Sequence, residues 1–240
     1  SLEPISNLPL PFIKSDTILK FDKDCIYETL KDGYGVDYII TNPPFSLEIQ
    51  QNEYQNFRMK EVIPFKNNMS TASECLFAER WFQLLNSKGR IGAVLPFSLF
   101  DSQEYTKAKL LFLCYFQIVA IVSLPEHAFA PHAQQRTVLV FAKKRKLDES
   151  NRLFVDIGDI KKFINNIKEE KIIFYDAKNI GYIRIKKQKT VITQETKNND
   201  LTDEIANIIS NAFERKYKNY PKVEILSMEE LFIKRNLNLT

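Results

Sequence analysis

One ten-residue stretch decides how the rest of this chain is interpreted: Val36-Asp37-Tyr38-Ile39-Ile40-Thr41-Asn42-Pro43-Pro44-Phe45. Its first six residues are mostly β-branched or aromatic, and they follow the turn residues Gly33-Tyr34-Gly35, so they predict a β-strand. The two consecutive prolines lack backbone N–H groups and end the strand. We therefore expect Asn42 to lie at the carboxyl end of a strand.

Strands and helices alternate downstream of this stretch. Apolar runs predict strands, and helical spacing predicts helices; the strands are expected at 90–96, 118–124 and 137–141, and the helices from Thr71 to Gly89 and over 102–116. Residues 47–68 are polar and are expected to form a loop. The last two strands are joined by a short segment without helical periodicity, which favours an antiparallel pair. The order predicts an α/β fold: a mostly parallel sheet with one antiparallel strand near its edge.

The chain changes character after Lys146. Strands are expected at 153–157 and 172–175 and a helix at 160–167, and the segment 182–185 alternates weakly. Asp200 is a candidate N-cap for a further helix that runs to about Tyr217. We therefore divide the chain into an α/β unit, residues 1–146, and a small α+β extension, residues 147–240.

Charge and composition narrow the classes of function. The net charge of +4 is uneven, because residues 143–240 contain 21 basic and 15 acidic residues. This pattern fits a nucleic-acid partner, and it equally fits a lysine-rich solvated surface. No apolar run is long enough to span a bilayer and no secretory leader opens the chain, which predicts a cytoplasmic protein without a membrane partner.

Metal chemistry is not expected. Cys25, Cys75 and Cys114 are scattered and read as buried reduced thiols. His127 and His132 lie in one segment, but no carboxylate or thiol completes a ligand set around them. We therefore predict no metal site.

The residues Asn42 to Phe45 suggest a specific chemistry. Ligands of open α/β sheets bind outside the carboxyl ends of the strands. An exocyclic amine on an aromatic base is a poor nucleophile because its lone pair is delocalised into the ring. The side-chain oxygen of Asn42 and the carbonyl of Pro43, held still by the successive prolines, could accept its two N–H groups. Phe45 could stack on a base swung out of a helix, or it could be an ordinary core aromatic.

The same residues carry a family resemblance. Asp37 to Phe45 resembles the catalytic motif of amino-group S-adenosylmethionine methyltransferases. Two further segments, Gly89 to Pro96 and Leu124 to Phe129 with Arg136 to Phe141 after it, resemble adenine-N6 DNA methylases. Together they are similar to the modification subunit of bacterial type I restriction systems, or to the methylase part of fused type II enzymes. The resemblance covers about residues 24–144.

The resemblance implies a fold and a set of roles. The fold is the C-terminal half of a Rossmann-like methyltransferase sheet, and the reaction is transfer of a methyl group from S-adenosylmethionine to adenine N6. Asn42, Pro43, Pro44 and Phe45 are then catalytic, and Phe129 packs against the target base opposite Phe45. Double-stranded DNA is the implied substrate, with a DNA-specificity subunit or domain and a restriction subunit as partners. Residues 180–201 are also similar to the region that follows the methylase sheet in type I modification subunits, and residues 234–239 resemble the approach to a DNA-specificity region.

The chain departs from the family on the cofactor side. It has six glycines in all, and none forms a glycine-rich turn after a strand ahead of Asn42. The acid that the family uses beside the cofactor corresponds to Asp24, with Asp16 as a rival. We therefore expect a C-terminal portion of a longer methylase, in which the parent protein binds S-adenosylmethionine and this portion alone is inactive.

Other readings stay open. Enzymes that methylate guanine N2 in RNA or glutamine side chains share the Asn-Pro-Pro-aromatic signature. A non-catalytic lobe that docks DNA or a specificity subunit would use the basic second half. Lys143 to Lys146 could contact phosphate or be a solvated strand end, and Glu169-Glu170-Lys171 is expected to be a solvated helix end.

Overall fold

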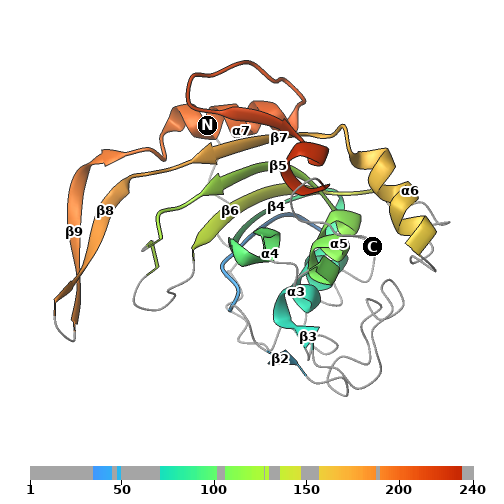
Figure 1. Ribbon diagram of the computed structural model, residues 1–240, viewed down its shortest axis with the longest axis horizontal. Coiled ribbons are helices and arrows are strands. Elements are labelled where there is room, and N and C mark those ends of the chain that lie inside the picture. The colour runs from blue at the N-terminus through green and yellow to red at the C-terminus, as the bar shows by residue number, and fades with distance from the viewer. Residues whose placement is uncertain are drawn as a thin grey trace, which may run out of the picture.

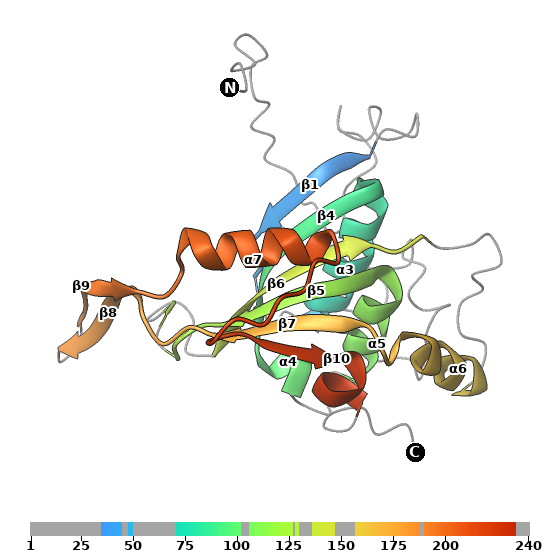
Figure 2. The ribbon, with the colours of Figure 1, turned by 90° about the horizontal axis from the view of Figure 1, so that it is seen from above.

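The computed structural model describes residues 35–44, 48–49, 71–101, 106–126, 128–129, 136–146, 157–187 and 190–233. Its centre is a six-stranded sheet in the order β1–β4–β6–β5–β7–β10 (Figures 1 and 2). The strands, in chain order, are β1 (Val36–Thr41), β4 (Leu85–Pro96), β5 (Phe116–Ser123), β6 (Thr137–Lys144), β7 (Lys171–Asp176) and β10 (Glu224–Ser227).

Strand directions confirm the expected fold class. β1 runs parallel to β4, and β5 runs parallel to β7. β6 lies between β4 and β5 and is antiparallel to both, so β1, β4, β5 and β7 share one direction. The reversed strand therefore lies inside the sheet instead of near its edge, because the extension adds β7 and the antiparallel β10 beyond β5. The two expected units share one sheet, and a boundary at residue 146 stays a prediction.

Helices cover both faces of the sheet (Figure 1). On one face lie α3 (Ser73–Leu84), α4 (Ser98–Asp101) and α5 (Thr106–Tyr115), and on the other lies α7 (Asp203–Phe213). An apolar cluster fills each interface, with Leu76 and Phe112 in the first and Ile208 in the second. α6 (Ile157–Ile167) and a π-helical turn (Glu229–Ile233) complete the described helices. None of the described helices is long and apolar enough to cross a membrane.

Several element boundaries differ from the sequence-based expectation. The helix expected to run to Gly89 ends at Leu84, because Leu85 is buried and pairs with Val36 as the first residue of β4. The helix expected over 102–116 ends at Tyr115, since Phe116 begins β5. The N-cap of α7 is Thr202, whose hydroxyl accepts from the backbone N–H of Ile205, and not Asp200.

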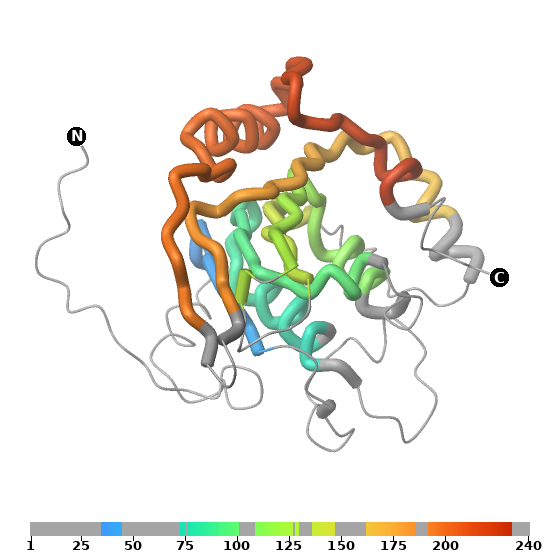
Figure 3. Tube along the Cα trace, turned by 60° about the vertical axis from the view of Figure 1, so that its left-hand side comes forward, coloured from blue at the N-terminus to red at the C-terminus, as the bar shows by residue number. Residues whose placement is uncertain are grey.

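A β-hairpin was incompletely predicted. β8 (Ile180–Lys187) contains the weakly alternating segment, and β9 (Thr190–Asn199) pairs with it although no strand was expected there. Figure 3 shows the two strands running side by side away from the sheet. β9 lacks an apolar periodicity because it covers no core. A second small pair of antiparallel strands consists of β2 (Glu48–Ile49) and β3 (Thr71–Ala72). β2 lies within the segment that was expected to be a loop.

Candidate active site

The Asn-Pro-Pro turn leaves the sheet at the end of β1. Thr41, the last residue of the strand, is paired with Ala93 of β4. Asn42 and Pro44 are exposed and Pro43 is buried. The buried hydroxyl of Ser73, at the start of α3, donates to the carbonyl oxygen of Pro44 at 3.4 Å. The turn is therefore held from beneath, and its asparagine is presented to solvent.

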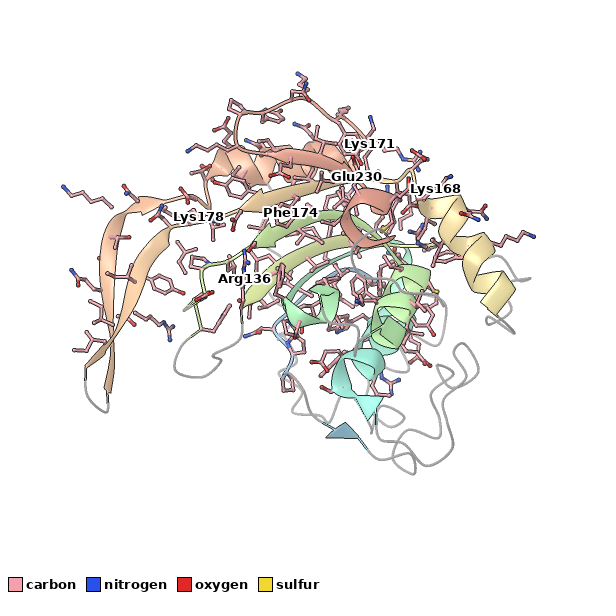
Figure 4. All side chains as sticks on the ribbon, in the orientation of Figure 1. Arg136, Lys168, Lys171, Phe174, Lys178 and Glu230 are labelled. Carbon is pink, nitrogen blue, oxygen red and sulfur yellow. The ribbon has the colours of Figure 1, made fainter. Side chains whose placement is uncertain are left out.

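The carboxyl ends of β1, β4, β5 and β7 lie at one edge of the sheet, which we call the carboxyl edge. Arg136, the residue before β6, joins several of these ends (Figure 4). Its guanidinium donates to the Ser123 hydroxyl at 2.6 and 3.1 Å and lies 3.4 Å from the carboxylate of Asp176. The same group lies 4.6 Å from the ring centroid of Phe97. Lys178 makes a second ion pair with Asp176.

The segment after β5 is also fixed at this edge. The backbone N–H of Leu124 donates to Thr137 at 3.0 Å, and that of Ala128 donates to Pro125 at 3.0 Å. The hydroxyl of Tyr182 in β8 donates to the Ala128 carbonyl at 2.9 Å. Phe129 follows directly; it is half-buried and packs against the apolar cluster beneath α7. Phe129 thus lies at the same edge as Asn42, with part of its side chain still accessible.

Asp200 closes the base of the hairpin. Its carboxylate accepts from the backbone N–H groups of Asn179 at 2.8 Å and Lys178 at 2.9 Å. These two bonds, the one from Asn179 first, lower the pKa of Asp200 below its usual value because they favour the charged form. The residue that was expected to cap α7 therefore fastens β9 to the end of β7.

The opposite end of the sheet, the amino edge, is closed by internal pairs. Arg145 makes a two-pronged ion pair with Glu170, each bond 2.6 Å long, and donates to the Leu113 carbonyl at 2.7 Å. Lys144 donates to the Leu85 carbonyl at 2.6 Å, and burial lowers the pKa of its ammonium group. Two members of the Lys143 to Lys146 run are therefore engaged within the protein. Glu170 is likewise paired, where a solvated helix end was expected.

The structure tests the geometry of only part of the predicted site. Asn42, Pro43, Pro44 and Phe129 lie among the described residues and share the carboxyl edge. Outside the described residues lie Phe45, Asp16, Asp24, His127 and His132. Within the described ranges no group of histidine, cysteine and carboxylate side chains could hold a metal ion.

Two residues that hold segments together at the carboxyl edge were not singled out from the sequence. Arg136 was noted only as the start of a family-like segment, and Tyr182 only as part of a weak strand. Both act through contacts between segments that are 40 to 54 residues apart in the chain. The sequence did carry one signal for Arg136, because it is a charged residue immediately before the buried strand β6.

The comparisons with known proteins agree with this fold. One chain of a type I restriction-modification structure, described for complex assembly and conformational transition, matches with a TM-score of 0.51 and 20% identity, covering 90% of this chain and 39% of that chain. The methyltransferase subunit of a type I restriction-modification system from Streptococcus thermophilus matches with a TM-score of 0.50 and 18% identity, covering 88% of this chain and 41% of that chain. At this level of identity the likeness concerns the fold, which is that of a Rossmann-like methyltransferase. The chain spans about two-fifths of the length of these structures.

The amino-acid sequence also matches a known protein family. The family model described as N-6 DNA Methylase matches residues 6–239. The chain therefore belongs to the N-6 DNA Methylase family. No curated protein matches the chain significantly.

Proposed function

We propose that this chain forms the target-base side of a DNA methyltransferase that transfers a methyl group to adenine N6 in a restriction-modification system. The observation that carries the proposal is the Asn-Pro-Pro turn at the carboxyl edge of a methyltransferase-type sheet. The exposed amide of Asn42 lies where ligands of such sheets bind. Membership of the N-6 DNA Methylase family supports the choice of reaction.

Each residue of the turn has a part in the proposed reaction. The side-chain oxygen of Asn42 and the carbonyl of Pro43 accept the two N–H groups of the adenine amine, which frees the nitrogen lone pair for attack. Because Pro43 is buried and Ser73 holds the next carbonyl, the backbone that carries the Pro43 acceptor is fixed before the base arrives. Phe45 and Phe129 stack on the extruded base from opposite sides.

S-adenosylmethionine is the proposed methyl donor, and its sulfonium-bound methyl group is the electrophile in this chemistry. The glycines that the structure describes do not form a cradle for it: Gly35, Gly89 and Gly92 border or lie within β1 and β4, Gly158 lies in α6, and Gly181 lies in the hairpin. Asp24, with Asp16 as the rival, remains the proposed acid on the cofactor side. We propose that the glycine-rich element comes from outside this chain, so that this chain alone is inactive.

Within the part of the chain that the structure describes, one face of β1 is left largely uncovered. Tyr38 and Ile40 are 68% and 92% exposed, and an apolar groove of about 300 Å³ separates β1 from Phe213 of α7. Apolar strand residues of this kind are ordinarily covered. The proposed cofactor-binding element would cover them by packing on this face of the sheet beside α7.

The substrate class is tested by offering labelled S-adenosylmethionine to the gene-encoded protein with separate pools of unmethylated DNA, ribosomal RNA and protein. We expect label in DNA only, recovered as N6-methyladenine after digestion to nucleosides. Label in RNA as N2-methylguanine, or in protein glutamine, would replace the proposal by one of the two alternative enzymes. If no pool is labelled, the remaining hypothesis is a non-catalytic lobe that docks DNA or a specificity subunit.

A further inference from the structure

The net positive charge of the chain is concentrated in the hairpin. Residues 180–199 contain five basic residues and one acidic residue, whereas the other 220 residues contain 29 of each. The 20 residues of the hairpin therefore account for the whole net charge of +4. A protruding segment with this charge attracts a polyanion, and the rest of the chain adds no net attraction.

The position of the hairpin relates this charge to the proposed site. β8 begins four residues after β7 ends, so the hairpin leaves the sheet at the carboxyl edge (Figures 1 and 3). Asn42 follows the last residue of β1 at the same edge. Two anchors fix its base. Asp200 accepts from the backbone of Lys178 and Asn179, and Tyr182 donates to Ala128 beside Phe129. The hairpin is therefore an arm held at a defined place next to the proposed base pocket.

The two faces of the hairpin differ. Direct pairing of Tyr182 with Glu195 and of Arg184 with Thr193 places these four side chains on one face. The guanidinium of Arg184 lies 5.6 Å from the ring centroid of Tyr182, on the side that approaches Ala128. The other face bears Ile183 and Ile192, which are 48% and 43% exposed, and by the same register Gln194 and Lys187. A two-stranded ribbon that carries basic residues on both faces has the dimensions to enter the major groove of DNA.

We propose that the β8–β9 hairpin is a DNA-contacting arm, which grips the duplex beside the target adenine through phosphate contacts from its lysines. Lys186 and Lys187 lie at the far end of β8 and Lys197 lies in β9. This proposal rests on the proposed function, because it takes DNA as the polyanion. It adds a binding element that is separate from the catalytic turn.

The test measures DNA affinity of the gene-encoded protein against salt concentration, using a 30-base-pair duplex. The triple variant Lys186→Gln, Lys187→Gln, Lys197→Gln is compared with a matched variant at the amino edge, Lys162→Gln, Lys168→Gln, Lys171→Gln (the last two are labelled in Figure 4). Both variants lose the same charge. We expect the hairpin variant to flatten the slope of log affinity against log salt by about 2 to 3, since each phosphate contact contributes about 0.9. The amino-edge variant should keep a slope close to that of the original protein.

The outcomes separate this proposal from the proposed function. Equal slopes for the two variants would overturn the DNA arm, even if the protein methylates DNA, and would leave Ile183 and Ile192 as a surface for a protein partner. A flattened slope in a protein that methylates none of the offered pools would uphold the arm and reject the enzyme. Circular dichroism of each variant shows whether a change in slope reflects loss of folding.

Discussion

The amino edge and the carboxyl edge of the central sheet differ in how far their charged and polar side chains are exposed. At the amino edge one ion pair is shielded, because Arg145 and Glu170 expose only 14% and 18% of their side chains. At the carboxyl edge Arg136 and Asp176 expose 39% and 34%, and Asn42 is exposed. Partly buried bidentate pairs stabilise a fold, whereas exposed polar groups at strand ends remain available to a ligand. The shielded pair and the exposed groups therefore lie at opposite ends of the strands.

The strands themselves show the same contrast. Ile118 lies near the start of β5 and is fully buried, whereas Ile40 lies two residues before Asn42 and is almost fully exposed. Both belong to apolar runs that look alike in sequence. Burial therefore depends on what lies beside a strand and not on the strand alone.

The largest expected effect is on stability at the buried strand. Ile118→Ala should lower the free energy of unfolding by about 2–5 kcal/mol, because it leaves a cavity in the core. Ile40→Ala, the matched control, should change it by less than about 0.5 kcal/mol in the 240-residue chain, where Ile40 is 92% exposed. Urea unfolding followed by circular dichroism measures both. Similar losses for the two variants would contradict the contrast between the strands.

A smaller effect is expected at the ion pair of the amino edge. Glu170→Ala leaves the guanidinium of Arg145 without its two-pronged partner, which should cost about 2–3 kcal/mol of stability. Glu214→Ala breaks the exposed pair with Arg90 and should cost under about 1 kcal/mol. If thermal unfolding shows the two variants to be equally stable, the shielded pair contributes no more than the exposed one.

At the carboxyl edge the effect on stability should be smaller again. Asp176→Asn removes the charge that pairs with Arg136 and Lys178, yet the pairs are exposed, so less than about 1 kcal/mol should be lost. Affinity for DNA should rise, by less than about tenfold at low salt, because a negative charge leaves the proposed binding edge. Weaker binding by a folded Asp176→Asn protein would show that Arg136 must be held in its present place.

The smallest effect concerns pH. The hydrogen bonds from Asn179 and Lys178 lower the pKa of Asp200 in the folded protein, so its contribution is complete above its ordinary pKa of about 3.8 and is lost as pH falls through the folded value. We therefore expect the protection factors of the amides at the hairpin base against hydrogen exchange to fall on acidification below about pH 4. Asp200→Asn should remove this pH dependence. An unchanged profile in that variant would assign the effect to another group.

The sequence predicted the parts of this molecule that depend on local pattern. The strand Val36–Thr41 was expected at its observed bounds, and the antiparallel pair of β5 and β6 followed from the short segment between them. The roles of Arg136, Tyr182 and Asp200 could not be predicted, because each depends on a contact between distant segments. β9 was missed since a strand that covers no core needs no apolar alternation. Of the predicted site, the positions of Asn42, Pro43, Pro44 and Phe129 are described, and their roles stay predictions.

The most direct test of the account is the rate of methyl transfer to adenine by the gene-encoded protein carrying Asn42→Ala. Because the amide oxygen is one of only two proposed acceptors for the amine, we expect the single-turnover rate to fall by about 100-fold or more while DNA affinity is unchanged. Asn211→Ala, an exposed asparagine of α7, should transfer at the original rate. Methylation by Asn42→Ala at a rate within a few-fold of the Asn211→Ala protein would contradict the account.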